Sequence, residues 1–261
     1  MAQVRLSALV RELRARVEVL EDSDWSPAVP PSSAAGRPAS VSSTAAPAAV
    51  ASASTAADPG VEHRFALLRE SVLACRKCPL GAQRLNPAFG VGDVHARVLF
   101  VGEGPGFEED RRGEPFVGKA GQLLDRILAA IGLSRETVYI ANVVKCHPMA
   151  DPSDPSKRGN DRPPSPEETE ACRGYLEEQI RLIRPRAMVA LGASAAKALL
   201  RTTDGITRLR GTWREYRLPE GGESIPVMPT YHPAALLRDE SLKRDAWEDM
   251  KALKKLLEAA P

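Results

Sequence analysis

Four cysteines are the residues of this 261-residue chain that most directly suggest a metal site. Cys75 and Cys78 form a Cys-x-x-Cys pair, whereas Cys146 and Cys172 follow separately. Four thiolates can bind either zinc or a [4Fe–4S] cluster. A zinc ribbon would usually have two such pairs and this chain has one, but the spacing does not decide between the two cofactors. Buried thiols without a metal are the remaining interpretation.

A glycine-rich segment, Gly102-Glu103-Gly104-Pro105-Gly106, ends an apolar run. Such a turn lets backbone amides approach a ligand closely. The segment has neither the Gly-Lys-Ser/Thr ending of a P-loop nor a Gly-x-Gly-x-x-Gly register, so it is not a nucleotide-phosphate loop. Glu108, Glu109 and Asp110 follow, and they are either solvated or include one carboxylate that orients a water molecule.

Two more polar residues stand where apolar segments end. Asn142 either caps nearby backbone or recognises a planar ring that carries one hydrogen-bond donor and one acceptor. His232 is placed to stabilise a leaving group. Leu236, Leu237 and Arg238 come just after this histidine and could enter a nucleic-acid duplex.

These residues need a scaffold, and the pattern predicts one in which strands and helices alternate. Apolar runs predict strands at 97–102, 137–144, 187–192 and 224–230, with helices at 118–133, 193–200 and 241–258. Another helix begins at Ser165 as N-cap, with Pro166 at the first helical position and Glu168 completing a capping box. The alternation predicts a parallel sheet covered on both faces. Ligands of such sheets bind at the carboxyl ends of the strands.

The first part of the chain differs in composition. Residues 1–22 predict an amphipathic helix that could dock a protein partner, and 23–61 form an Ala/Pro/Ser-rich linker with too little apolar area to fold. The folded domain is expected at 62–261. No signal peptide or apolar run of eighteen residues is visible, so we expect a cytoplasmic protein that does not enter a membrane. A net charge of +2 means that any nucleic-acid-binding face must be a local patch.

The motifs together resemble the family 4 uracil-DNA glycosylases, the iron–sulfur branch of that superfamily. The likeness covers about residues 66–258 and includes, in order, GEGPG, PFVGKAGQLLD, NVVKCHP, the two later cysteines and HPAALLR. It implies a three-layer α/β/α sandwich around a four-stranded parallel sheet. It also implies hydrolytic release of uracil from DNA by a monomeric catalytic domain. On the same grounds, Cys75, Cys78, Cys146 and Cys172 would hold a [4Fe–4S] cluster rather than zinc.

The resemblance also implies roles for individual residues. Phe116 would stack on the flipped uracil, Asn142 would hydrogen-bond its edge, and His232 would stabilise the uracil oxygen that gains charge. Glu103 and Glu109 are the candidates for positioning the attacking water. Gly104 stands in the substrate-binding loop where better-known uracil glycosylases have an aspartate, so the resemblance leaves both glutamates open as the residue that activates water.

Two other functions remain open. A related branch traps DNA covalently through a histidine in a long basic loop; here Lys157-Arg158 continues as Gly-Asn-Asp-Arg, which favours turnover. The other alternative is a non-enzymatic iron–sulfur DNA-binding protein. The proximity of Lys145 to the motifs also keeps a Schiff-base lyase reaction open.

Overall fold

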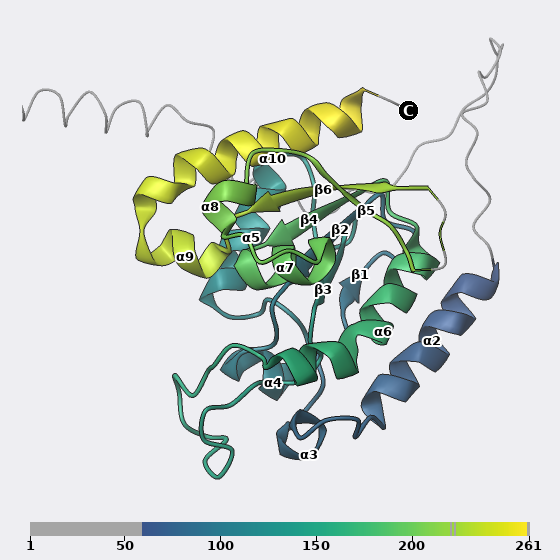
Figure 1. The fold of residues 1–261 in the computed structure, drawn as a ribbon, viewed down its shortest axis with the longest axis vertical. Coiled ribbons are helices and arrows are strands. Elements are labelled where there is room, and N and C mark those ends of the chain that lie inside the picture. The colour runs from purple at the N-terminus through teal and green to yellow at the C-terminus, as the bar shows by residue number, and fades with distance from the viewer. Residues whose placement is uncertain (1–58, 220, 222, 260–261) are drawn as a thin grey trace, which may run out of the picture. The chain divides into compact units, whose positions relative to one another are not determined.

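The computed structural model describes residues 59–259, except 220 and 222 (Figure 1). They belong to one compact unit, residues 58–261. The helix predicted at 1–22 lies outside the described residues, as does most of the linker predicted at 23–61. Helix α2, Pro59–Leu73, begins before the domain boundary predicted at residue 62. The last three residues of the predicted linker are therefore helical.

The described residues form one six-stranded sheet with the strand order β1-β3-β2-β4-β6-β5. The four central strands are parallel and correspond to the four predicted ones: β2 Val98–Gly102, β3 Tyr139–Asn142, β4 Ala187–Leu191 and β6 Ile225–Thr230. Two antiparallel edge strands, β1 Val91–Gly92 and β5 Arg214–Tyr216, extend the sheet. The sheet therefore has two more strands than the four that the sequence predicted, and both of them are at its edges.

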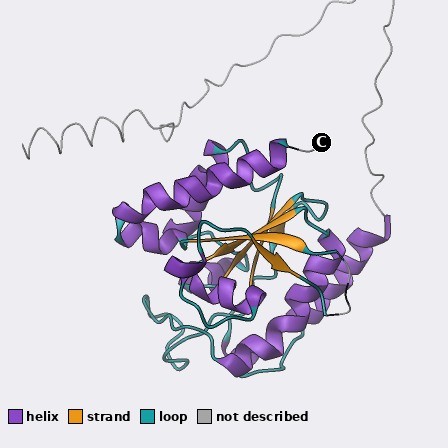
Figure 2. Cartoon of the chain, turned by 45° about the horizontal axis from the view of Figure 1, so that its top comes forward, coloured by secondary structure: helices purple, strands orange, loops and turns teal. Residues whose placement is uncertain are grey.

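Helices cover both faces of the sheet, as Figure 2 shows. The connection from β2 to β3 runs along the sheet in one direction, and the connections from β3 to β4 and from β4 to β6 run in the other. Because crossovers between parallel strands are right-handed, the helices in these two sets of connections lie on opposite faces of the sheet. Leu99, Val101 and Met188 lie in one apolar core with residues of α2, α6 and α7. Side chains alternate along a strand, so Phe100 and Val189 face the other layer.

The helices largely follow the predicted segments. Their bounds are α3 Leu80–Gln83, α4 Phe107–Arg112, α5 Lys119–Ala130, α6 Pro166–Ile183, α7 Ala193–Leu200, α8 Ile206–Leu209, α9 Pro233–Arg238 and α10 Lys243–Glu258, with a 3-10 turn at Glu240–Leu242. The predicted capping box of α6 is confirmed, because the Ser165 hydroxyl accepts from the Glu168 amide and the Glu168 carboxylate accepts from the Ser165 amide. Among the described helices, none has the length and apolar character needed to span a membrane.

Candidate functional site

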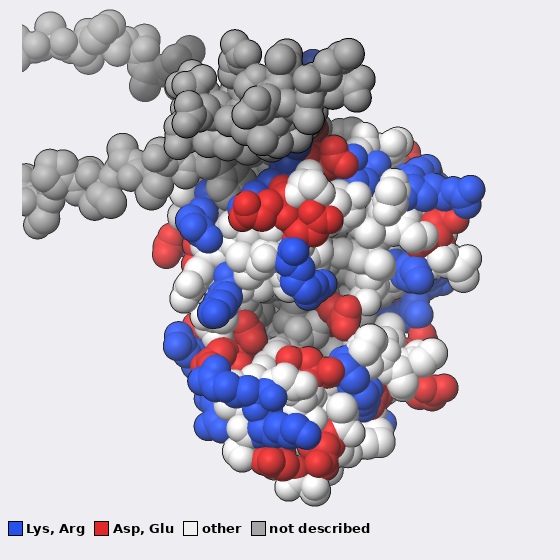
Figure 3. Space-filling model, turned by 90° about the vertical axis from the view of Figure 1, so that its left-hand side faces the viewer, with Lys and Arg blue, Asp and Glu red and all other residues white. Residues whose placement is uncertain are grey.

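A cavity of about 520 Å³ opens at the carboxyl ends of the parallel strands. Four parts of the chain line it: the glycine-rich loop after β2 with α4, the segment that leads into α5, the end of β3 with the long loop that follows, and α9 with the residue before it. Their lining residues include Glu103, Gly104, Glu109, Phe116, Lys119, Asn142, Arg158, Asp161, Arg162, His232 and Arg238. Figure 3 shows the surface on the side that bears α9 and the long loop, where basic and acidic side chains intermingle around a hollow. The predicted site residues of three strand ends thus meet in one place.

Gly102 sets the spacing of the site. It pairs with Asn142 across the parallel β2–β3 ladder. A Cβ atom at this position would meet the Asn142 Oδ1 atom and would lie 2.6 Å from the ring of Phe116. Only glycine therefore lets the amide and the aromatic ring approach the same strand end.

The Asn142 side chain is held ready for a ligand. The residue is 1% exposed, and its Oδ1 atom has no hydrogen-bond partner within the described part of the chain. An unsatisfied buried carbonyl oxygen costs about 1–3 kcal/mol, so such a group in a native site calls for a partner. A ligand that donates an N–H into the cavity would supply one.

Phe116 is fixed by its backbone. Its φ angle of 56° lies in the left-handed region, and its carbonyl oxygen accepts from the Arg135 guanidinium. Gly121, on the first turn of α5, packs so tightly on the Phe116 backbone that a Cβ atom there would collide with it. The strained conformation is consequently held from both sides, and it directs the ring to the cavity.

His232 has a defined tautomer. It is the N-cap of α9, and its Nδ1 atom accepts from the Ala234 amide at 3.1 Å. A backbone amide can only donate, so the proton of the neutral ring is on Nε2. Burial, assisted by the charge of Arg238, lowers the pKa of His232 to about 4. At neutral pH the ring is therefore an uncharged donor, and its centroid lies 5.5 Å from that of Phe116.

The two candidate water-positioning carboxylates differ in their surroundings. Oε2 of Glu103 accepts from the Ser194 hydroxyl at 2.5 Å, in the first turn of α7. Glu109 accepts three backbone amides, from Val117 and Gly118 at Oε1 and from Gly106 at Oε2. Glu109 thus ties the loop together, whereas the Glu103 carboxylate retains acceptor capacity toward the cavity. Sequence reasoning missed Ser194, whose only signal was its place just after β4.

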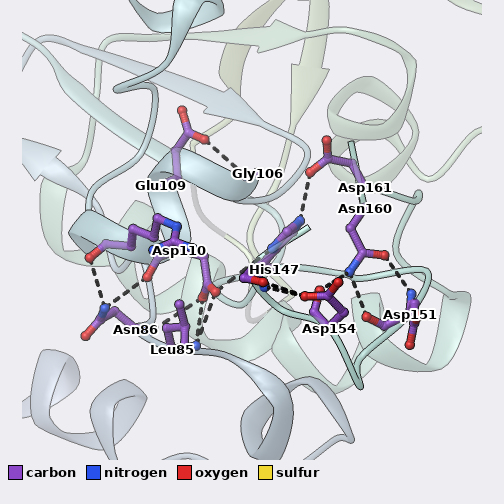
Figure 4. Close-up of polar contacts among 12 residues, drawn as sticks. Leu85, Asn86, Gly106, Glu109, Asp110, His147, Asp151, Asp154, Asn160 and Asp161 are labelled. Carbon is purple, nitrogen blue, oxygen red and sulfur yellow. Dashed lines mark hydrogen bonds and ion pairs between the residues drawn. The ribbon is translucent and has the colours of Figure 1, made fainter. Parts of the chain in front are cut away.

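The long loop after Cys146 brings in further residues that the sequence did not single out. Figure 4 shows the imidazole of His147 between Asp161 and Asp110. Its Nε2 atom lies 2.8 Å from Asp161, and its Nδ1 atom lies 4.0 Å from Asp110. This hydrogen bond lowers the pKa of Asp161, and burial raises that of Asp110. The histidine therefore anchors the loop at the cavity, and Arg162 reinforces the anchor through Glu168.

All four cysteines line a second, much smaller cavity beside the first. Lys77, Arg84 and Lys145 also line it, and its described wall contains no carboxylate. Arg84 Nη1 donates to Cys146 Sγ at 3.0 Å. Within the described residues, no three metal-binding side chains converge as a single metal ion would require.

Comparison with known proteins identifies the family. Residues 89–251 match the uracil DNA glycosylase superfamily. The chain belongs to this superfamily. Type-4 uracil-DNA glycosylases from Archaeoglobus fulgidus and Thermotoga maritima are each 42% identical to it, over 73% and 75% of this chain and 91% and 96% of theirs. One from Pyrobaculum aerophilum is 40% identical, over 70% of this chain and 89% of its own. Within the superfamily, the chain is therefore a member of the type-4 family.

The DNA contact expected for this type-4 family member needs one correction. Leu236 is 1% exposed and packs inward, so it cannot enter a duplex. Leu237 is 44% exposed, and Arg238 lines the cavity, so the expected DNA contact is limited to these two. Gly104 does line the cavity, and a Cβ atom there would lie 2.7 Å from a Val144 methyl group, which explains the glycine.

We predict that NMR of the ring nitrogens will show His232 as the neutral Nε2–H tautomer from pH 8 down to about pH 5. The reason is that burial and Arg238 hold its folded-state pKa at about 4. The unfolded value is about 6.5. The histidine therefore stabilises the fold fully above that value and progressively less as the pH falls toward 4. A titration midpoint near 6.5 in the folded protein would contradict the assignment.

Proposed function

We propose that this chain is a uracil-DNA glycosylase, which hydrolyses the N-glycosidic bond of deoxyuridine in DNA and leaves an abasic site. The observation that carries the proposal is the unpartnered Oδ1 atom of Asn142, buried beside the Phe116 ring and the His232 donor in one cavity. Uracil has a flat ring, an N3–H donor and flanking carbonyl oxygens, which match these three groups. The type-4 relatives bear the name of the same activity.

Recognition of uracil requires that the base leave the DNA double helix. A duplex shields the glycosidic bond, so the nucleotide is flipped into the cavity. There the ring stacks on Phe116, and Asn142 Oδ1 accepts from uracil N3–H while the amide nitrogen donates to the adjacent carbonyl oxygen. Cytosine has no N3–H, so it leaves the Asn142 oxygen unsatisfied.

The bond between C1′ and N1 breaks with its electron pair moving into the uracil ring. His232 Nε2–H donates to the uracil carbonyl oxygen on which that charge develops, and a neutral donor needs no proton transfer to do so. A water oxygen then bonds to C1′ of the oxocarbenium-like sugar. Glu103, held by Ser194, orients this water and takes its proton, and the uracil anion is protonated from solvent.

DNA is held around the mouth of the cavity. Lys119, Arg158 and Arg238 line it and supply positive charge for phosphates. Leu237 is the exposed apolar side chain that can fill the space left in the duplex. Because the overall charge is only +2, binding depends on this local set of charges.

Cys75, Cys78, Cys146 and Cys172 are proposed to bind a [4Fe–4S] cluster. Their shared cavity and its three basic side chains suit an anionic group made of four thiolates and metal. When bound, the cluster supplies a covalent cross-link between the α2–α3 segment, the end of β3 and α6. The hydrolysis itself is not a redox reaction, so it needs no electron from the cluster.

The proposed catalytic unit is the described domain, and the N-terminal extension lies outside its chemistry. Lys145 does not line the larger cavity, which argues against a Schiff-base lyase reaction. A covalent trap would need a free histidine nucleophile in the long loop, and His147 there is buried and hydrogen-bonded to Asp161.

One assay separates the three functions. The full chain is incubated with uracil-containing DNA and the products are resolved under denaturing conditions. We expect free uracil and an abasic strand. A persistent protein–DNA adduct would instead mean trapping, and intact DNA with retained binding would mean a non-enzymatic protein.

We predict that His232→Ala and Asn142→Asp fail in different ways. His232 acts on charge that exists only as the bond breaks, so its loss should lower the single-turnover rate about a hundredfold or more with little change in DNA affinity. Asn142 also holds the flipped base, so Asn142→Asp should weaken both the rate and the preference for uracil. If both variants only melted several degrees lower and kept near-normal rates at low temperature, neither residue would belong to the site.

Gly102→Ala is predicted to keep the fold but displace the Asn142 amide and the Phe116 ring, because its methyl group needs their space. Misplacement by about 1 Å can cost a hundredfold in rate. The matched control is Gly174→Ala, on the exposed side of α6, where a methyl group meets nothing within 4 Å. The control should retain the native rate and gain up to about 1 kcal/mol of stability. Equal rates for both variants would mean that Gly102 does not shape the site.

Metal analysis after anaerobic purification should give about four irons per chain and a brown protein. Replacing any one of the four cysteines by serine should lower the iron content and the melting temperature together, because the cross-link is lost. Stoichiometric zinc in the native chain would instead make this a zinc site.

A further inference from the structure

Lys145 lines the cysteine cavity, and its ammonium group reaches the strand end from which Asn142 enters the larger cavity. The lysine is 1% exposed. Its Nζ atom donates to the backbone carbonyl of Asn142 at 2.7 Å and to Gln179 Oε1 at 2.6 Å. Its backbone amide donates to Cys172 Sγ at 3.3 Å, and its side chain lines the cysteine cavity. One buried residue thus contacts both the end of β3, which carries Asn142, and the cysteines proposed to bind the cluster.

This buried cation needs a counter-charge. Within the described residues, no carboxylate oxygen lies within 4.0 Å of the Lys145 ammonium group, and the two oxygens that accept its hydrogen bonds are neutral. A charge buried without an opposite charge is strongly unfavourable. The nearest groups that can carry negative charge are the thiolates of the cysteine cavity.

Arg84 points to the same anionic occupant. One of its nitrogen atoms donates to Cys146 Sγ, and the other donates to backbone carbonyls of Val72, Leu73 and Cys75. No carboxylate partner of Arg84 is found in the described part of the chain. Lys145 and Arg84, two cations of the cavity wall, therefore have only neutral partners and cysteine sulfur. An anionic cluster in the cavity would supply the negative charge that both of them lack.

We propose that Lys145 is a positioning residue that couples the cluster to the uracil pocket. Its charge offsets that of the cluster, and the same ammonium group holds the carbonyl of Asn142, which fixes where the side-chain amide stands against Gly102 and Phe116. Loss of the cluster charge would leave Lys145 buried without compensation and would loosen its hold on the strand end. This inference rests on the proposed function, because it needs both the cluster and uracil recognition.

The test compares the full-length holoprotein with its Lys145→Met variant. Three quantities are measured: the iron content, the reduction potential of the cluster, and binding to a duplex that carries 2′-fluoro-deoxyuridine, which resists hydrolysis. Removing a nearby positive charge disfavours adding an electron, so the potential should fall. Binding should weaken about tenfold relative to the same duplex with thymine, equal to ~1.4 kcal/mol. Lys254→Met, which removes an exposed charge from α10, should change none of the three quantities.

A second variant protects the test against misfolding. Gln179→Glu keeps the shape of the side chain and gives Lys145 a carboxylate partner, so it should also lower the potential and weaken uracil-specific binding. Native values of either quantity in a folded variant would overturn the coupling. If the wild-type chain held no cluster or released no uracil, the proposed function itself would fail and this inference with it.

Discussion

The close approach of three chain segments at Gly102 is the constraint on which the site depends. The parallel pairing of β2 with β3 places Gly102 opposite Asn142, and the missing Cβ leaves room for the amide and for the Phe116 ring. The left-handed conformation of Phe116 is tolerated because Arg135 and Gly121 hold its backbone. A parallel sheet therefore supplies a rigid floor, and the loops supply the groups that act above it.

The two cavities share one short segment of chain. Asn142 lines the proposed uracil pocket, Lys145 and Cys146 line the cysteine cavity, and His147 holds the long loop through Asp161. Lys145, with its buried positive charge, and His147, which holds the long loop, both follow this strand end. A structural cluster can in this way stiffen the pocket without taking part in the chemistry.

Much of this arrangement could be predicted from the sequence, because it depends on local patterns. Apolar runs located the four parallel strands, and Ser165 located the start of α6. The rest depends on tertiary packing. Strand β5 contains exposed Arg214 and Glu215 and has no apolar run that would predict a strand. Leu236 and Leu237 are the same residue type in the sequence, and only the packing of α9 shows that the first is buried and the second exposed. For the same reason, the sequence could not separate Glu103 from Glu109, since only the fold shows which carboxylate the backbone amides occupy.

The central claim is that the unpartnered oxygen of Asn142 reads uracil. A crystal structure of the protein with free uracil, the proposed product, tests it most directly. The account predicts the ring stacked on Phe116, with uracil N3 within about 2.7–3.2 Å of Asn142 Oδ1 and a carbonyl oxygen accepting from His232 Nε2. Uracil bound elsewhere, or bound in this cavity with the Asn142 oxygen still without a partner, would contradict it.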